Sequence, residues 1–124
     1  MGNRGTIVSK EYIGPYDGLT SHQNIETNYN EIYFYTHWSG SDLPQILASA
    51  LSRGRSRWDD SSYLNRIIFS EMTKDEKWDE LTGFGITSCG QIDSQTNLIV
   101  DHKTQTVEYK NKKYPFEDFI QRFK

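Results

Sequence analysis

The chain has little cysteine, little proline and no long apolar run. Of its 124 residues, one is cysteine and three are proline. The single Cys89 excludes an internal disulfide, and no zinc-finger spacing of cysteines and histidines is present, so we expect no metal to hold the fold. No apolar run approaches the roughly 20 residues of a membrane helix, and residues 1–5 lack the apolar stretch of a secretion signal. We therefore expect a cytoplasmic protein with no membrane partner.

The signatures of common enzymes are also missing. The chain has no Gly-x-Ser-x-Gly elbow of a serine hydrolase and no glycine-rich phosphate loop that ends in Gly-Lys-Ser/Thr. The paired carboxylates of Asp59 and Asp60 are more typical of a helix cap than of an acid/base pair. These absences favour a binding protein over an enzyme, and we expect no cofactor.

The composition is that of a folded domain. Hydrophobic residues make up 35% of the chain and charged residues 25%, and the aromatic residues, 14% of the total, include eight tyrosines. This is too apolar for a disordered tail, and the length suits one domain that spans residues 1–124. The net charge of −3 opposes bulk binding to the phosphate backbone of a nucleic acid.

Several segments have the β-branched and aromatic composition of strands. The richest is 31–38, which ends before Ser39-Gly40, and we expect it to be a central strand. Residues 10–30 contain Gly14-Pro15 and Asp17-Gly18, which are typical of a long loop. The other expected strands are 5–9, 82–88, and a hairpin of 98–100 with 106–109, followed by a turn at 111–113.

Helical spacing of apolar residues predicts three helices. The first is capped by Ser41 or Asp42, has Pro44 in its first turn and ends at Gly54. The second is capped by Asp59 or Asp60, and the third covers 115–123. The apolar stripe expected on the second helix consists of Tyr63, Leu64, Ile67, Ile68 and Met72. The pattern indicates an α+β fold, with a mainly antiparallel sheet, a two-helix unit on one face and a short C-terminal helix.

Residues 35–88 also carry a series of short motifs: YTHWSG at 35–40, LP at 43–44, RGR at 53–55, RW at 57–58, RIIFSEM at 66–72 and TGFGI at 82–86. This series resembles a family of small bacterial and phage proteins, whose members often begin with an Asn-Arg pair such as Asn3-Arg4. The resemblance covers 35–88 well, the N-terminal strand weakly and 10–30 not at all. It implies a prokaryotic or phage origin and implies no activity.

The segment between the first two expected helices concentrates positive charge. Arg53, Arg55 and Arg57 are spaced two residues apart, and Trp58 follows. Guanidiniums bind phosphate or carboxylate bidentately, and an indole can stack on a base. Two other interpretations are a protein interface and a solvated loop, in which the arginines pair with Asp59, Asp60 or the last carbonyls of the first helix.

A second group of candidate residues surrounds the end of the central strand. His37 and Trp38 precede a helix N-terminus, where backbone amides attract anions, and His37 could also act as an acid or base. With Arg4 and Phe84, they could converge with the arginines on one pocket. The competing interpretation is that His37 is half-buried and organises the strand end, while Trp38 fills the core.

We predict a non-enzymatic binding protein, encoded by a phage or mobile element and with an anti-defence role. Its partner is expected to be a host protein or a phosphorylated small ligand such as a signalling nucleotide. An alternative is a small enzyme that acts on a phosphorylated substrate with His37 as acid or base. A third class is an oligomer-forming domain in which the strand around Tyr33 and Tyr35 makes a sheet-edge contact, and we expect a homodimer. The predicted ligand-binding residues are Arg4, His37, Trp38, Arg53, Arg55, Arg57, Trp58 and Phe84.

Overall fold

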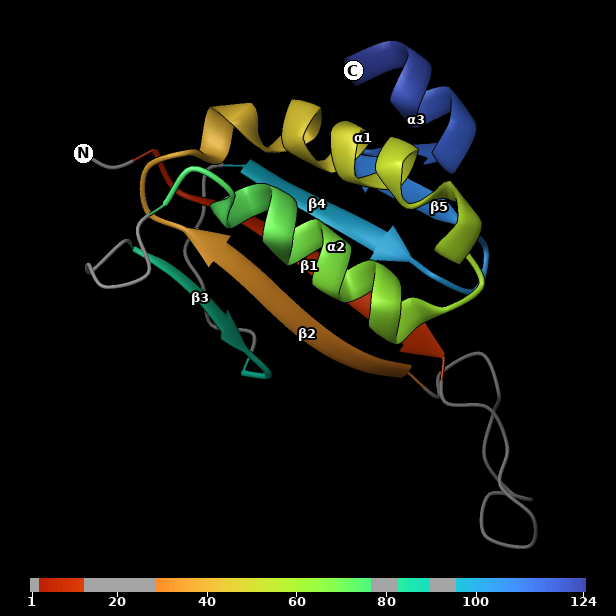
Figure 1. The fold of residues 1–124 in the computed structure, drawn as a ribbon, viewed down its shortest axis with the longest axis horizontal. Coiled ribbons are helices and arrows are strands. Elements are labelled where there is room, and N and C mark those ends of the chain that lie inside the picture. Colours follow the sequence, from red (N-terminus) through yellow and green to blue (C-terminus); the bar gives the residue numbers. More distant parts are fainter. Residues whose placement is uncertain (1–2, 13–28, 77–82, 90–95) are drawn as a thin grey trace, which may run out of the picture.

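The protein folds into one six-stranded sheet and three α-helices (Figure 1). The computed structural model describes residues 3–12, 29–76, 83–89 and 96–124. The strands are β1 (Gly5–Tyr12), β2 (Tyr29–Thr36), β3 (Phe84–Thr87), β4 (Thr96–Asp101), β5 (Thr106–Tyr109) and β6 (Lys112–Pro115). The helices are α1 (Leu43–Arg53), α2 (Ser61–Thr73) and α3 (Phe116–Phe123), with short 3-10 turns at Gly40–Asp42 and Arg55–Arg57.

The strand order in the sheet is β3-β2-β1-β4-β5-β6. All neighbouring strands are antiparallel except β1 and β4, which pair in parallel in the centre of the sheet, with Ile7 opposite Leu98. The strand expected at 31–38 is β2, which runs from Tyr29 to Thr36 and lies inside the sheet between β1 and β3, one strand from the edge. For the same reason, the proposed sheet-edge contact at Tyr33 and Tyr35 is wrong.

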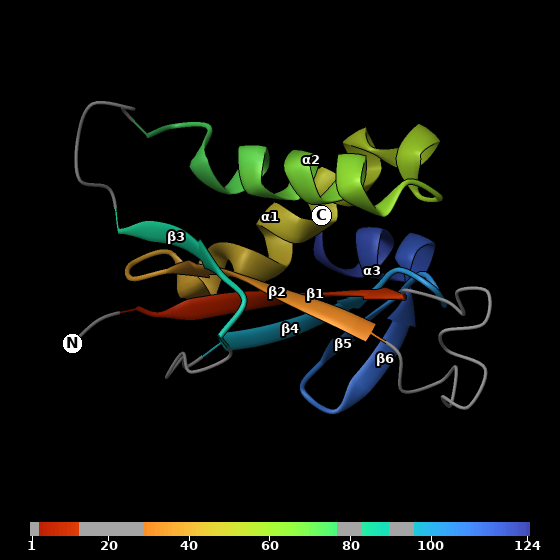
Figure 2. The same cartoon turned by 90° about the horizontal axis from the view of Figure 1, so that it is seen from below.

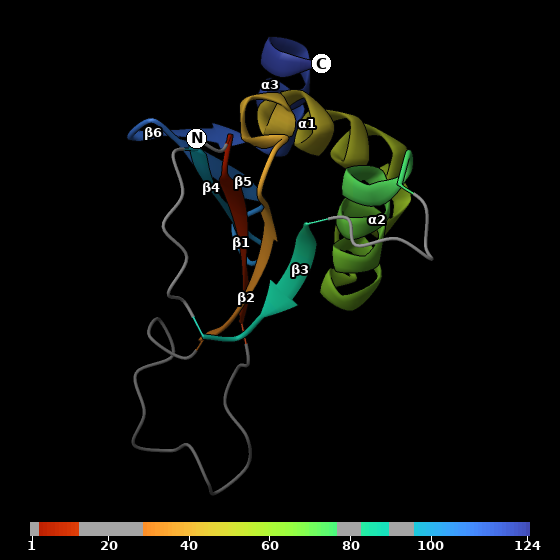
Figure 3. The same cartoon turned by 90° about the vertical axis from the view of Figure 1, so that its left-hand side faces the viewer.

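The helices cover one face of this sheet. Figure 2 shows α1 and α2 on the same side, and Figure 3 shows α1 between α2 and α3. Helix α1 packs against both neighbours. The buried apolar side chains between the layers are Ile7, Phe34, Leu43, Leu47, Ala48, Ala50, Leu51, Leu64, Ile68, Met72, Leu98, Val100, Val107, Phe116, Phe119 and Ile120. This arrangement confirms the predicted α+β fold with its two-helix unit and C-terminal helix.

The ends of the helices follow local rules. Asp60 caps α2 by accepting a hydrogen bond from the Tyr63 backbone amide at 3.2 Å, so the choice between two candidate caps falls on Asp60. Gly54 ends α1, and a Cβ at this position would press on Leu64 of α2. The predicted apolar stripe is wrong at Tyr63, which is 40% exposed.

A tight corner joins β2 to α1 and contacts the beginning of β1. The Asn3 side chain donates to the Ser41 hydroxyl and accepts from the Ser41 amide, and the Gly40 amide donates to the Asn3 carbonyl. A Cβ at Gly40 would collide with the backbone of Arg4. The two backbone segments can therefore approach each other here only because residue 40 is glycine. This contact fixes where α1 begins relative to the sheet.

Some segments differ from the expected boundaries. Strand β1 extends to Tyr12, beyond the predicted end at residue 9, because β2 pairs with it as far as Tyr12 and β4 as far as Lys10. Strand β6 follows a turn at Lys110 and Asn111, both with positive φ, and was not predicted. Residues 13–28 of the predicted loop lie outside the described residues.

The two edges of the sheet differ in composition. Strand β6 carries Lys112, Lys113 and Pro115, whereas β3 reads Phe-Gly-Ile-Thr and has neither charge nor proline.

Among the described residues, no helix has the length and apolar character needed to cross a membrane.

Candidate functional site

The three arginines at the end of α1 and in the turn that follows it have different contact partners. Arg53, in the last turn of α1, pairs with Glu71 of α2. Arg55 pairs with Glu117 of α3. The predicted partners, Asp59 and Asp60, are occupied elsewhere, because Asp59 accepts from Gln105 and Asp60 caps α2. The solvated-loop interpretation is therefore wrong about these acids.

Arg57 has a different environment. Its guanidinium lies 4.4 Å from the centre of the Tyr63 ring, and the guanidinium of Arg66 lies 4.9 Å from the same ring. Within the described part of the chain, neither arginine has a carboxylate partner. A cation over an aromatic face is attracted electrostatically by the ring quadrupole. The tyrosine therefore holds two positive charges without neutralising them.

These residues line a solvent-open pocket of about 310 Å³, which we call the cationic pocket. Arg53, Arg57 and Arg66 supply three guanidiniums, and two serine hydroxyls add neutral donors. The full lining is Arg53, Ser56, Arg57, Tyr63, Arg66, Ile67 and Ser70. Every one of these groups except Ile67 can donate a hydrogen bond, which is the chemistry of an anion site.

Glu71 pairs with Arg53, one of the residues that line this pocket, and is only 4% exposed. Burial by itself raises the pKa of the Glu71 carboxyl, but hydrogen bonds from Lys74 and Arg53 outweigh it, and the pKa is lowered overall. Because Glu71 stays ionised, it offsets part of the charge of Arg53. Lys74 shares the same carboxylate at 2.9 Å, so the compensation of Arg53 is incomplete.

The other predicted site residues lie at the opposite end of α1. Arg4 precedes β1 and His37 follows β2, next to the corner where α1 begins. At 1.5 Å per residue, the 11 residues of α1 separate this corner from Arg53 by about 16 Å. The structure therefore does not bring Arg4, His37 and Phe84 together with the arginines of the cationic pocket.

His37 and Trp38 are both exposed, in contrast to the half-buried histidine and core tryptophan of the competing interpretation. The Trp38 indole, 58% exposed, lies against Gly83, whose φ of +75° and missing Cβ leave space for the ring. The His37 ring contacts the rings of Tyr35 and Trp38. These side chains form an aromatic surface at the end of β2.

Trp58 also differs from its predicted role. Its indole Nε1 donates to the Leu51 carbonyl at 2.9 Å, and its ring meets Phe116 edge-on with the centroids 5.1 Å apart. The indole is thus used to join α1 to α3, and it does not line the cationic pocket.

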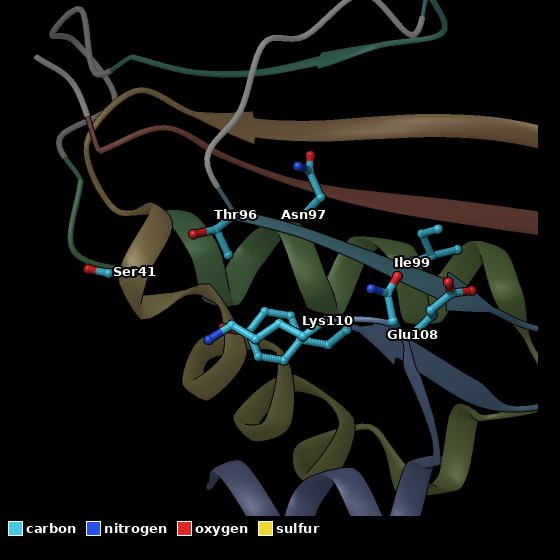
Figure 4. A pocket seen from close by; sticks show the side chains of 8 residues that line it. Ser41, Thr96, Asn97, Ile99, Glu108 and Lys110 are labelled. Carbon is cyan, nitrogen blue, oxygen red and sulfur yellow. The ribbon is translucent and has the colours of Figure 1, made fainter.

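Two larger pockets carry no net positive charge. One of about 600 Å³ lies beside β4 and the β5–β6 turn, where Glu108 and Lys110 carry opposite charges (Figure 4). Its lining is Ser41, Thr96, Asn97, Ile99, Glu108, Tyr109, Lys110 and Asn111. The other, of about 450 Å³, contains Phe84 and is acidic, with Asp42, Glu71, Asp75 and Glu76 against Lys74. An anion is repelled by the second pocket and gains no net attraction in the first.

A buried polar cluster was missed at the sequence level. Ser9 Oγ donates to Asn65 Oδ1 at 2.6 Å, and His102 Nε2 lies 2.8 Å from Ser9 Oγ and 3.0 Å from Asn65 Oδ1. Ser9 is 0% exposed, so substrate has no access to its hydroxyl. We therefore read this cluster as a structural link between β1, α2 and the β4–β5 turn.

Arg66, Tyr63 and Ser70 were also missed as site residues. A signal for them exists, because residues 63, 66, 67 and 70 follow helical spacing and share one face of α2. Because Tyr63 was assigned to the buried apolar stripe, this exposed face of α2 was not recognised as a candidate binding surface.

Comparisons of the chain with protein-family models, with curated proteins and with solved structures find no match. The resemblance to a bacterial and phage family therefore stays a prediction.

Proposed function

We propose that the protein is a binding protein for a phosphorylated small ligand, which it holds in the cationic pocket. The observation that carries the proposal is that Arg57 and Arg66 share the Tyr63 ring and have no carboxylate partner in the described residues. Arginine pairs bidentately with phosphate, and such charge-assisted bonds are stronger than neutral ones. A capture role of this kind agrees with the phage or mobile-element origin that we predict from the sequence.

The charge of the whole chain does not argue against this site. The net charge is −3, yet the cationic pocket gathers three of the arginines in a small volume. Coulomb energy depends on the nearest charges, because salt screens exposed charges beyond about 8 Å at physiological ionic strength. The local charge decides which ligand is attracted.

The enzyme alternative has no support from the described geometry. His37, its proposed acid or base, is exposed at the end of β2 and does not line the cationic pocket. A general base must lie within hydrogen-bond reach of the proton that it removes. We therefore do not carry this alternative forward.

The proposal is tested by calorimetric titration of the full chain with inorganic phosphate, 5′-AMP and cyclic AMP. We expect binding of at least one of these anions, and we expect Arg57→Ala and Arg66→Ala each to weaken it about tenfold or more, as for the loss of a charge-assisted hydrogen bond.

A matched control is Arg122→Ala, which removes the same charge from α3, where Arg122 lies over the Phe123 ring. Its affinity should stay within twofold of the wild-type value. No heat with any of the three anions, or equal weakening by Arg122→Ala, would contradict the proposal.

A further inference from the structure

We infer that the cationic pocket selects a phosphomonoester dianion over a phosphodiester. This inference rests on the proposed function, because it asks which anion the same residues prefer. It follows from the number of uncompensated charges and from the number of oxygen atoms that the donors require.

The charges of the pocket match a dianion. Arg57 and Arg66 have no acid partner in the described residues, and the charge of Arg53 is partly offset by Glu71. Two positive charges are therefore fully available. A phosphomonoester carries about −1.5 to −2 at pH 7. A diester carries one negative charge and would leave one guanidinium without a counter-ion.

The donors of the pocket also favour a monoester. Each guanidinium presents a planar fork that prefers two acceptor oxygens. Two forks, together with the hydroxyls of Ser56 and Ser70, need more acceptors than two oxygens can offer in suitable directions. A monoester has three terminal oxygens and a diester has two, so only the monoester can engage both forks and still accept from a serine.

The ring of Tyr63 makes this geometry selective. Both guanidiniums lie within 5 Å of its centroid, at 4.4 and 4.9 Å, so a weak cation–π attraction favours a position near the ring for each of them before a ligand arrives. A restricted pair of forks binds the matching arrangement of oxygens at a low entropic cost and adapts poorly to another. The volume of about 310 Å³ is near the lower limit for ligand pockets, which suits a phosphate on a compact organic group.

The test compares 5′-AMP with 3′,5′-cyclic AMP. Both contain adenine and ribose, and they differ in the phosphate, which is a monoester in 5′-AMP and a diester that also esterifies the 3′ oxygen in cyclic AMP. We expect wild-type protein to bind 5′-AMP at least about tenfold more tightly, which corresponds to one charge-assisted hydrogen bond. Equal affinities would overturn this inference and leave the proposed function intact, whereas no binding of either nucleotide or of inorganic phosphate would overturn the proposed function itself.

A second variant separates charge from geometry. Arg57→Lys keeps the positive charge but removes the planar fork. We expect it to weaken binding of 5′-AMP about tenfold and to bring the two nucleotides within about threefold of each other. If Arg57→Lys retains the full wild-type preference, the planar fork is not a source of selectivity and the geometric part of the inference is wrong. Thermal unfolding of the variant checks that the fold is unchanged.

Discussion

His102 is the residue whose burial has the clearest consequence for stability. Its side chain is 8% exposed, its Nε2 lies within hydrogen-bond distance of Ser9 and Asn65, and its Nδ1 has no partner among the described groups. Burial lowers the pKa of His102 below its ordinary value, although the carboxylates of Glu11 and Asp101 act in the opposite direction. The folded protein therefore prefers a neutral imidazole.

This preference predicts a pH-dependent stability. Between the ordinary pKa of about 6.5 and the lower pKa of the folded state, the unfolded chain binds a proton that the folded chain does not. The contribution of His102 to the free energy of unfolding is thus fully present above about pH 6.5 and is lost as the pH falls through the folded pKa. We expect the urea midpoint to fall between pH 7 and pH 5.

The matched variant for this experiment is His102→Gln, which retains a donor and an acceptor but does not titrate. Its urea midpoint should change less than that of the wild-type protein over the same pH range, in which carboxylates remain mostly ionised. Equal slopes for the two proteins would show that another group is responsible.

At the scale of elements, Trp58 joins the end of α1 to α3 through its bond to the Leu51 carbonyl and its ring contact with Phe116. We expect Trp58→Phe to lower the free energy of unfolding by about 1–2 kcal/mol. The change removes the indole N–H that the Leu51 carbonyl accepts and reduces the area of the aromatic contact with Phe116. Urea denaturation measures this change.

The phosphate affinity of Trp58→Phe should stay within twofold of the wild-type value, because the indole does not line the cationic pocket. The opposite outcome, lost phosphate binding with unchanged stability, would restore the ligand-stacking role that we first predicted from the sequence.

The helices were predictable because their signals are local. Asp60 and Gly54 act on residues within one turn of themselves, and apolar spacing identifies a buried face wherever the helix packs. Strand order is not a local property. Nothing within β1 or β4 indicates that these strands pair in parallel, because each has only the composition of a buried strand.

The same distinction explains the partial prediction of the site. Arg53 and Arg57 were found because they lie in one short segment. Arg55 and Trp58 instead contact α3. Arg55 pairs with Glu117, which is 62 residues away in the sequence, and the Trp58 ring packs against Phe116. Contacts over such a distance depend on how the helices pack, and a charge pattern alone does not reveal them.

At the scale of the whole molecule, the two ends of the chain complete one core. Residues 96–124 supply β4, the parallel neighbour of β1, and six of the buried core residues: Leu98, Val100, Val107, Phe116, Phe119 and Ile120. We expect a fragment of residues 1–89 to show no cooperative unfolding, because α1 loses one packing surface and β1 loses one partner.

A synthetic peptide of residues 96–124 added to this fragment should restore helical circular dichroism and a cooperative transition. The control is the same peptide with Val100→Asp, which buries a charge opposite Val107 and should fail to restore folding. A cooperative transition by residues 1–89 alone would contradict the prediction.

The unequal edges of the sheet limit how copies of this protein can assemble. Of the two edge strands, β6 carries lysines and a proline, which disfavour pairing with a strand of another copy, and β3 carries neither. If two copies joined through β3 around a twofold axis, the β3 edge of each copy would be paired in the interface. An assembly of this kind would expose only lysine-bearing edges, and we expect it to stop at two copies rather than to grow into a fibre.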